Sequence, residues 1–158
     1  MRPSLEVKLA TTAEAEEIAV LSRDAVEHGL PWRWTAERVR RCLRDANTNV
    51  AVARDGHALL GFGIMRYADD EAHLLLFAVA PGHRRRGVGA AILQWLEAVA
   101  KTAGLAKVIL ECRRENEPGR NFYGALGYHE QLIVRRMYEG VEDGITLEKW
   151  LTAEPPPP

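Results

Sequence analysis

The stretch Val79-Ala80-Pro81-Gly82-His83-Arg84-Arg85-Arg86-Gly87-Val88-Gly89-Ala90 is the most informative part of this sequence. It follows an apolar, strand-like run over residues 74–79 and leads into a helix-like run over residues 90–100. A turn at a helix N-terminus presents free backbone N–H groups and the positive end of the helix dipole, and both attract phosphates. Gly87 and Gly89 would let a phosphate approach the main chain, and the three arginines add charge and forked donors. The stretch therefore predicts a strand, a phosphate-binding turn and a helix.

The glycine spacing narrows the choice of ligand. The turn lacks the Gly-Lys-Ser/Thr ending of a P-loop, and no third glycine completes a dinucleotide fingerprint after Gly87-x-Gly89. What remains is Arg84-x-x-Gly87-x-Gly89, and one alternative is an ordinary basic turn that caps a helix. A second segment, residues 111–128, contains Glu-x-Arg, then Asn, then Phe-Tyr-x-x-Leu-Gly-Tyr. The two segments, in this order and at this distance, resemble the acetyl-CoA loop and the second signature of the GNAT superfamily of N-acetyltransferases.

The resemblance covers about residues 51–138 and implies the GNAT fold. This is an α/β (α+β) architecture with a mixed, mostly antiparallel sheet of six or seven strands and helices on both faces. Residue patterns predict strands over residues 5–9, 49–54, 58–67, 72–79, 107–113, 128–138 and 145–151. They predict helices over residues 11–28, 36–44, 90–103 and 118–126. We expect residues 1–152 to form a single domain and residues 153–158 a Pro-rich C-terminal tail.

Composition excludes several classes of protein. With 158 residues, 47% hydrophobic and 27% charged, the chain is typical of one ordinary globular domain. A net charge of −1 argues against a nucleic-acid partner despite the arginine run. No apolar stretch approaches the roughly 20 residues of a membrane helix, and the N-terminus lacks a signal-peptide core. Cys42 and Cys112 lack metal-ligand spacing, so we expect reduced thiols, no metal and a cytoplasmic location.

The resemblance also implies where acetyl-CoA, as co-substrate, would bind. The backbone of Phe77, Ala78 and Val79 would pair with the pantetheine arm and polarise the acetyl oxygen, although Phe77 and Val79 are also ordinary core residues. Asn116 would bind the pantetheine, or would only cap the next helix. The pyrophosphate-binding residues would be Arg84, Arg85, Arg86, Gly87, Val88, Gly89 and Ala90, with Arg84 alternatively ordering the turn.

Two residues are the candidates for acid–base chemistry. The family places a phenol beside the CoA sulfur, and Tyr123 occupies that position as general acid; the alternative is a core or rim aromatic. Glu111 is the candidate general base, and the alternative is an ion pair with Arg113 or another arginine. Glu111 precedes Tyr123 by twelve residues, the base-to-acid spacing of the ribosomal-protein alanine N-acetyltransferases, which this chain further resembles. His73 is the second candidate base. Strand alternation puts Cys112 on the opposite face from Glu111, which argues against a cysteine nucleophile.

The acceptor residues are inferred from weaker similarities. The Pro-Trp pair ending at Trp32 and the Arg-Arg-x-Tyr segment ending at Tyr138 resemble substrate-binding segments of N-terminal-amine acetyltransferases. Met137, Glu139 and Trp34 depart from that pattern, so the acceptor stays undetermined. Trp32 and Trp34 are equally interpreted as loop-anchoring core. We expect direct attack by a primary amine in a ternary complex, with a protein N-terminal α-amine as acceptor.

Three readings compete with this one. They are a small-molecule amine acetyltransferase, a non-catalytic acyl-CoA-binding or sensing module, and a nucleotide-binding regulatory domain. The resemblance leaves a homodimer open, because GNAT enzymes often pair through their C-terminal strands. The acyl-chain length that the enzyme accepts is also open.

Overall fold

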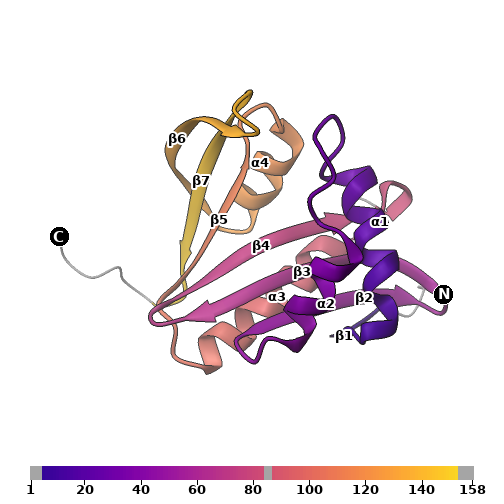
Figure 1. Ribbon diagram of the computed structural model, residues 1–158. Helices are drawn as coiled ribbons and strands as arrows, with labels where there is room; N and C mark the ends of the chain where they lie inside the picture. Colours follow the sequence, from indigo (N-terminus) through magenta and orange to yellow (C-terminus); the bar gives the residue numbers. More distant parts are fainter. Residues whose placement is uncertain (1–4, 84–86, 153–158) are drawn as a thin grey trace. The chain divides into compact units, whose positions relative to one another are not determined.

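The computed structural model describes residues 5–83 and 87–152, and the expected tail and the three arginines lie outside those ranges. Figure 1 shows the order of elements. The strands are β1 (Glu6–Leu9), β2 (Thr48–Asp55), β3 (Ala58–Ala68), β4 (Glu71–Val79), β5 (Lys107–Arg113), β6 (His129–Tyr138) and β7 (Glu142–Trp150). The α-helices are α1 (Ala15–Ala25), α2 (Ala36–Arg44), α3 (Val88–Thr102) and α4 (Glu117–Ala125). Two 3₁₀ turns, η1 (Thr12–Glu14) and η2 (Pro81–His83), precede α1 and α3.

The strands form one hydrogen-bonded series in the order β1-β2-β3-β4-β5-β7-β6. β4 and β5 are parallel, whereas β1–β2, β2–β3, β5–β7 and β6–β7 are antiparallel. The predicted mixed, mostly antiparallel seven-stranded sheet is therefore confirmed. The predicted strands match within one residue, except that β7 begins three residues early.

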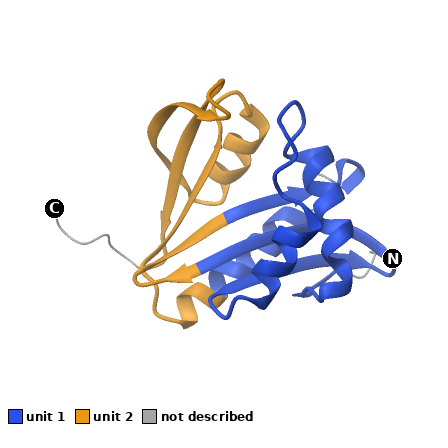
Figure 2. Cartoon of the chain, viewed as in Figure 1, with its two compact units in different colours: residues 1–66, 75–98 blue, residues 67–74, 99–158 orange. Residues whose placement is uncertain are grey.

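The chain contains two compact units, residues 1–66 with 75–98 and residues 67–74 with 99–158 (Figure 2). In the first unit, helices cover both faces of the sheet. Phe62 and Ile64 of β3 are fully buried in one cluster with Ile18 of α1 and Val39 of α2. The alternate residues of β3 face α3, and a Cβ added at Gly63 would lie 2.8 Å from the Leu96 Cδ1 atom. The absent side chain thus allows α3 to approach the sheet.

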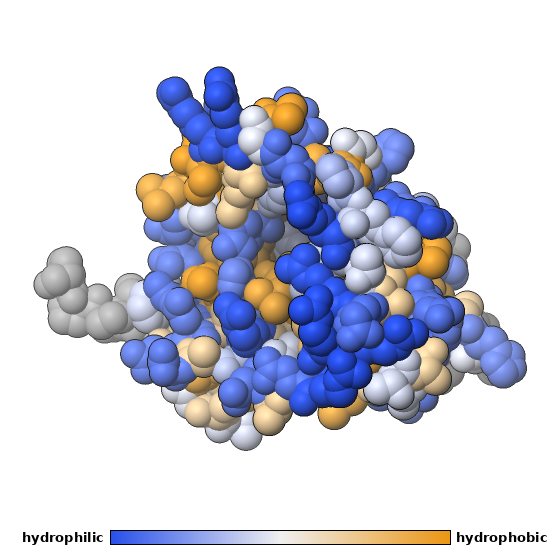
Figure 3. Space-filling view, viewed as in Figure 1, coloured by the Kyte–Doolittle hydropathy of each residue, from blue (hydrophilic) through white to orange (hydrophobic). Residues whose placement is uncertain are grey.

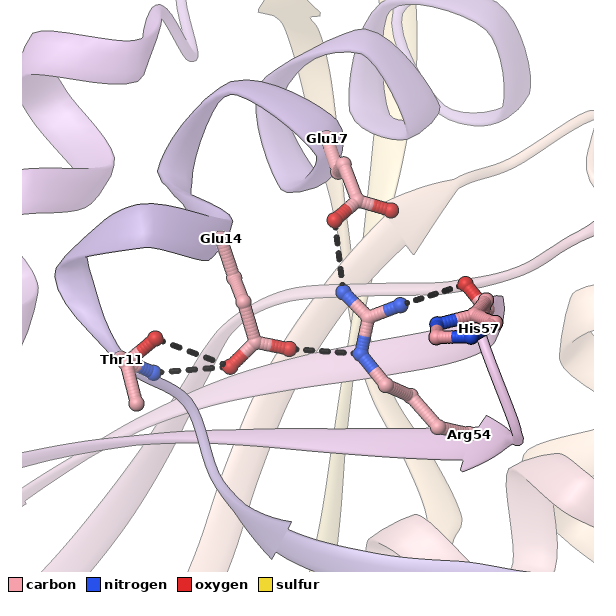
Figure 4. Close-up of polar contacts among 5 residues, drawn as sticks. All are labelled: Thr11, Glu14, Glu17, Arg54 and His57. Atoms are coloured by element: carbon pink, nitrogen blue, oxygen red, sulfur yellow. Dashed lines mark hydrogen bonds and ion pairs between the residues drawn. The ribbon is translucent and has the colours of Figure 1, made fainter.

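Figure 4 shows how the start of the first helix is tied to the sheet in this unit. Arg54 of β2 donates to Glu14 at 2.7 Å, to Glu17 at 2.7 Å and to the carbonyl oxygen of His57 at 3.0 Å. Glu14 also accepts from the Thr11 backbone N–H at 2.9 Å, which is the reciprocal half of a capping box that the Thr11-x-x-Glu14 spacing allows. The carboxylate therefore caps the helix start and holds the β2–β3 hairpin at once.

The second unit contains the parallel β4–β5 contact and the last two strands. Glu71–Leu74 of β4 pair with Lys107–Leu110 of β5, and β5 pairs along its length with β7. Burial alternates along β5: Val108, Leu110 and Cys112 are buried, whereas Glu111 is half-buried. Alternation therefore leaves the Glu111 face of β5 accessible to a ligand.

The helices differ from the prediction at several ends: α3 begins two residues early, at Val88, and the start of the first helix is the 3₁₀ turn η1 instead of α-helix. The helix expected to extend to His28 ends at Ala25, because the Val26 and Glu27 amides both donate to the Ser22 carbonyl oxygen and the chain turns there. The predicted stop at Gly104 is confirmed. That glycine has a φ of +82°, and the Leu105 amide donates back to the Ala100 carbonyl oxygen. Among the described residues, no helix is long and apolar enough to span a membrane.

Candidate active site

The glycine turn precedes α3 as the sequence predicts. Gly87 has a φ of +79°, and its carbonyl oxygen accepts the Ala91 amide at 3.0 Å. A Cβ at Gly87 would meet no atom within 4 Å, so the backbone conformation, rather than space, requires glycine. Val88 and Gly89 are buried in the first turn of α3, and Ala90 is half-buried. The first turn of α3 thus presents amides that have no partner within the helix, together with the positive end of the helix dipole, and both favour an anion.

The end of β4 lies beside this turn in the same unit. Ala78 is buried in the core cluster, and Phe77 and Val79 are half-buried. The next amide, that of Ala80, donates to the Leu60 carbonyl oxygen at 2.8 Å. Ala78 is therefore the core residue of this strand end, whereas Phe77 and Val79, for which the sequence also allows a core role, are only half-buried.

The two candidate bases are bonded to each other in the second unit. The Nε2 atom of His73 lies 2.6 Å from Glu111 Oε2, with side chains 25% and 26% exposed. Arg113, the alternative ion-pair partner of Glu111, forms a salt bridge with Glu142 at 3.4 Å. His73 on β4 is in register with Ile109 on the parallel strand β5, and Glu111 lies two residues beyond Ile109 on the same face of the sheet. Strand geometry alone therefore brings the imidazole to Glu111.

A hollow opens beside this carboxylate within the second unit. It has a volume of about 410 Å³. Its lining combines apolar side chains with four polar ones, and it comprises Ile109, Leu110, Glu111, Gln131, Leu132, Thr146, Leu147 and Glu148. Two carboxylates in a partly apolar hollow can attract a cationic amine and then accept one of its protons.

Tyr123 lies on α4 and is almost completely buried, with 8% of its surface exposed. Its ring packs edge-on against Phe122 and Tyr128, with ring centres 5.2 and 5.8 Å away. Burial, with smaller effects of Cys112 and Tyr138, raises the pKa of the Tyr123 phenol well above its ordinary value. The phenol therefore keeps its proton at physiological pH, but it is a weaker acid than a solvent-exposed tyrosine.

Cys112 faces away from Glu111, as strand alternation predicts. Burial raises the pKa of its thiol to about 11, so the reactive thiolate is scarce near neutral pH. The structure thus supports the argument against a cysteine nucleophile.

Tyr138 ends β6, and the structure brings it into the electrostatic neighbourhood of the base. Burial raises the pKa of its phenol, and the nearby Cys112 and Glu111 groups raise it further. Asn116 caps α4, because its Oδ1 atom accepts the Gly119 amide at 3.0 Å. The capping alternative for Asn116 is therefore confirmed, and a contact with pantetheine would be an additional role.

The two tryptophans of the α1–α2 loop differ in their environment. Trp34 is 9% exposed and belongs to the core cluster, and the Arg38 guanidinium stacks 3.8 Å from its ring centre. Trp32 is 43% exposed, with Arg23 at 5.2 Å. The core interpretation therefore holds for Trp34 and is wrong for Trp32, which is left available to a ligand.

Glu27 holds this loop, a role that no motif in the sequence indicates. Its side chain is buried, with 7% exposed, yet it carries a carboxylate. One oxygen accepts the Arg33 and Trp34 amides at 2.6 and 3.0 Å, and the other accepts the Ser22 hydroxyl at 2.9 Å. Glu27 falls beyond the last turn of α1 beside His28 and Gly29, where a charged residue is usually solvated. Only its inward orientation reveals the role.

Comparisons with known proteins identify the family. Residues 13–128 match the acetyltransferase (GNAT) family. The chain is 31% identical over 126 residues to the [ribosomal protein bS18]-alanine N-acetyltransferase of Escherichia coli K12, covering 76% of this chain and 81% of that protein. It is 31% identical over 98 residues to streptothricin acetyltransferase of Streptomyces lavendulae, covering 61% and 51% of the two chains.

Solved structures agree on the fold. The crystal structure of the E. coli ribosomal-protein-S18-alanine N-acetyltransferase superposes with a TM-score of 0.82 at 24% identity, covering 96% of this chain and 97% of that one. Arabidopsis thaliana NAA60 in complex with acetyl-CoA superposes with a TM-score of 0.82 at 14% identity, covering 94% and 99%. Both likenesses concern the fold.

Proposed function

The chain belongs to the GNAT family of acetyltransferases and is an acyltransferase, and from this premise we propose that it acetylates a protein N-terminal α-amine with acetyl-CoA as co-substrate. The observation that best supports this reaction is the half-buried Glu111 carboxylate beside a hollow, in the same unit as the protonated phenol of Tyr123. The relative acting on the alanine of a ribosomal protein favours the α-amine.

The co-substrate would supply an activated acetyl thioester, and the residues at the start of α3 fit its phosphates. The positive φ of Gly87 and the first-turn amides of Val88, Gly89 and Ala90 would hold the pyrophosphate, with Arg84, Arg85 and Arg86 adding charge. The backbone of Phe77, Ala78 and Val79, with Asn116, would hold the pantetheine arm.

Glu111 would take a proton from the ammonium group of the acceptor, which leaves a neutral amine. The amine nitrogen would then bond to the acetyl carbon, the carbon–sulfur bond would break, and the sulfur would keep the electron pair. The second proton that the nitrogen loses on becoming an amide would pass to that sulfur, so that CoA leaves as a thiol, and Glu111 would release its own proton to solvent. Tyr123 would donate a hydrogen bond to that sulfur. Full transfer of the proton from a phenol of raised pKa to a thiolate is uphill, so stabilisation of the developing charge is the larger part of its role.

Trp32 and Tyr138 would contact the acceptor, one from the exposed loop and the other beside Glu111. A small-molecule amine is the second candidate acceptor, and the similarity to streptothricin acetyltransferase favours it.

The same proposal places the enzyme in the cytoplasm, consistent with its two free cysteines among the described residues.

We further propose that residues 1–152 form one domain, and that a homodimer, if present, uses β6. Leu132, Ile133 and Met137 are exposed on this strand, and Figure 3 shows apolar surface there. Light scattering on the purified chain would settle the oligomeric state.

The test of function measures release of CoA thiol from acetyl-CoA with a panel of acceptors. The panel contains peptides beginning with Ala, Ser, Met or Gly, lysine peptides, polyamines and aminoglycosides, and mass spectrometry locates the acetyl group. Turnover on a peptide α-amine supports the proposal. Turnover on small amines alone moves the assignment to the second candidate. Stabilisation by CoA without any turnover points to a sensing module, and stabilisation by ATP instead of CoA points to a nucleotide-binding domain.

A further inference from the structure

We propose that His73 is the positioning residue for Glu111: it occupies one carboxylate oxygen and aims the other at the acceptor. The proposal rests on the proposed function, because it concerns the group that takes the amine proton. It makes His73 a supporting group instead of the second base considered from the sequence.

The strands place the two side chains with little freedom. His73 belongs to the parallel segment Glu71–Leu74, and Glu111 lies two residues beyond its register partner Ile109, on the same face. The 2.6 Å separation between Nε2 and Oε2 is that of a short, charge-assisted hydrogen bond. Because both backbones are fixed by sheet pairing, the bond selects one orientation of the Glu111 carboxylate.

The surrounding charges leave the imidazole as the partner of Glu111. Lys107 pairs with Glu148 at 3.1 Å and with Glu71 at 3.8 Å, and Arg113 pairs with Glu142 at 3.4 Å. The ionisable groups facing the pair are therefore Glu71 on β4, Lys107 and Arg113 on β5, Tyr138 on β6, and Glu142 and Glu148 on β7. In the described ranges, His73 is the hydrogen-bond partner of Glu111.

A glutamate needs such a partner to act as a base. Its side chain has several rotatable bonds, and a base must hold its oxygen within hydrogen-bond reach of the proton it takes. With Oε2 occupied by His73, the Oε1 atom is left for the hollow that Glu111 lines. An imidazole with a proton on Nε2 donates in both its neutral and its charged form, so the bond survives a change of protonation.

Two substitutions separate positioning from proton transfer. The Nε2 amide of glutamine donates a hydrogen bond from nearly the same place, but it cannot accept a proton at any ordinary pH. Leucine has a similar volume and no donor. We therefore expect His73→Gln to keep kcat within about 3-fold of wild type, and His73→Leu to lose about 10- to 100-fold. We expect unchanged KM for acetyl-CoA in both, and for Glu111→Gln a loss of at least about 100-fold in kcat.

The pH profile of kcat/KM supplies a readout that a purely structural role would not move. In His73→Gln the limb due to the base stays, because Glu111 still acts, whereas in His73→Leu it shifts or flattens. If His73→Gln and His73→Leu both fall to the level of Glu111→Gln, His73 is itself the base and the proposal is overturned. Wild-type kinetics in His73→Leu overturn it as well.

A separate measurement keeps this test independent of turnover. The ¹⁵N resonance of the His73 Nε2 atom reports the hydrogen bond in the full chain without any acceptor. We expect Glu111→Gln to move that resonance, while Glu148→Gln, which removes a carboxylate of the same hollow that pairs with Lys107, leaves it in place. An unmoved resonance overturns the pairing. A wild-type chain that shows the bond but acetylates no amine overturns the proposed function alone.

Discussion

Replacing Glu27 should separate the effect of its shape from the effect of its charge. In Glu27→Gln the side-chain amide oxygen can occupy the Oε1 position and still accept from the Arg33 and Trp34 backbone amides. Its NH₂ group then faces the Ser22 hydroxyl, whose oxygen can accept a hydrogen bond from it. Charge-assisted bonds become neutral ones of about half the strength, and relief from burying a charge offsets part of this loss. We expect a net loss of about 1 kcal/mol in the free energy of unfolding.

Glu27→Leu should cost far more. Two backbone amides and one buried hydroxyl lose their acceptor, and each unsatisfied group costs about 1–3 kcal/mol when it stays buried. Arg33 is exposed, so its amide regains water when the loop moves, and we expect a total near 4 kcal/mol. At about 2–4 °C per kcal/mol for a chain of this length, Tm falls by about 8–16 °C, against about 2–4 °C for Glu27→Gln.

Urea unfolding followed by circular dichroism measures both values, with Ser22→Ala as the matched control that removes one donor. The variants should also raise the KM for the acceptor more than that for acetyl-CoA, because Trp32 lies in the loop that Glu27 holds. Equal losses for glutamine and leucine, or a leucine variant within 1 kcal/mol of wild type, would refute the assignment of three hydrogen bonds.

Three further predictions concern stability and reactivity. Burial alone would raise the pKa of Glu14, but the Thr11 amide and Arg54 outweigh it and lower that pKa below its ordinary value. Glu14→Gln should therefore cost about 2 kcal/mol at pH 7, and the difference in urea midpoints should shrink as the pH falls through the lowered pKa. Cys112→Ala should acetylate at the wild-type rate, and iodoacetamide at pH 7.5 should leave activity intact, since a thiol with a pKa of about 11 is scarcely ionised. Gly124→Ala should raise Tm by about 1–4 °C, because an added methyl group meets open space within α4.

Each of these three predictions has an outcome that would contradict it. A Glu14→Gln deficit that does not shrink at all on acidification would mean that shape rather than charge is lost. Rapid loss of activity on alkylation would indicate that Cys112 acts as a nucleophile. Gly119→Ala, whose methyl group would collide with the capping Asn116 side chain, should destabilise the same helix that Gly124→Ala stabilises, and equal effects would contradict the packing described.

The order and type of the elements could be predicted from the sequence, because local chemistry determines them. Alternation marks β5, glycines of positive φ end α3 and α4 at Gly104 and Gly127, and the Asp55-Gly56 turn joins β2 to β3. These signals lie within a few residues of each other and need no tertiary contact. Glu111 and Tyr123 could be predicted as candidate base and acid for a different reason, because they occupy motif positions at a fixed spacing.

What the side chains touch was decided by tertiary structure. His73 and Glu111 are 38 residues apart in sequence and meet because parallel pairing fixes the register of β4 on β5. Glu27 turns inward because the loop after it needs acceptors for two amides. The acidity of Tyr123 likewise depends on burial that a Phe-Tyr pair does not encode locally. Patterns along the chain determine the elements and the motif positions, whereas hydrogen-bond partners and proton affinities depend on which distant groups folding brings within a few ångströms.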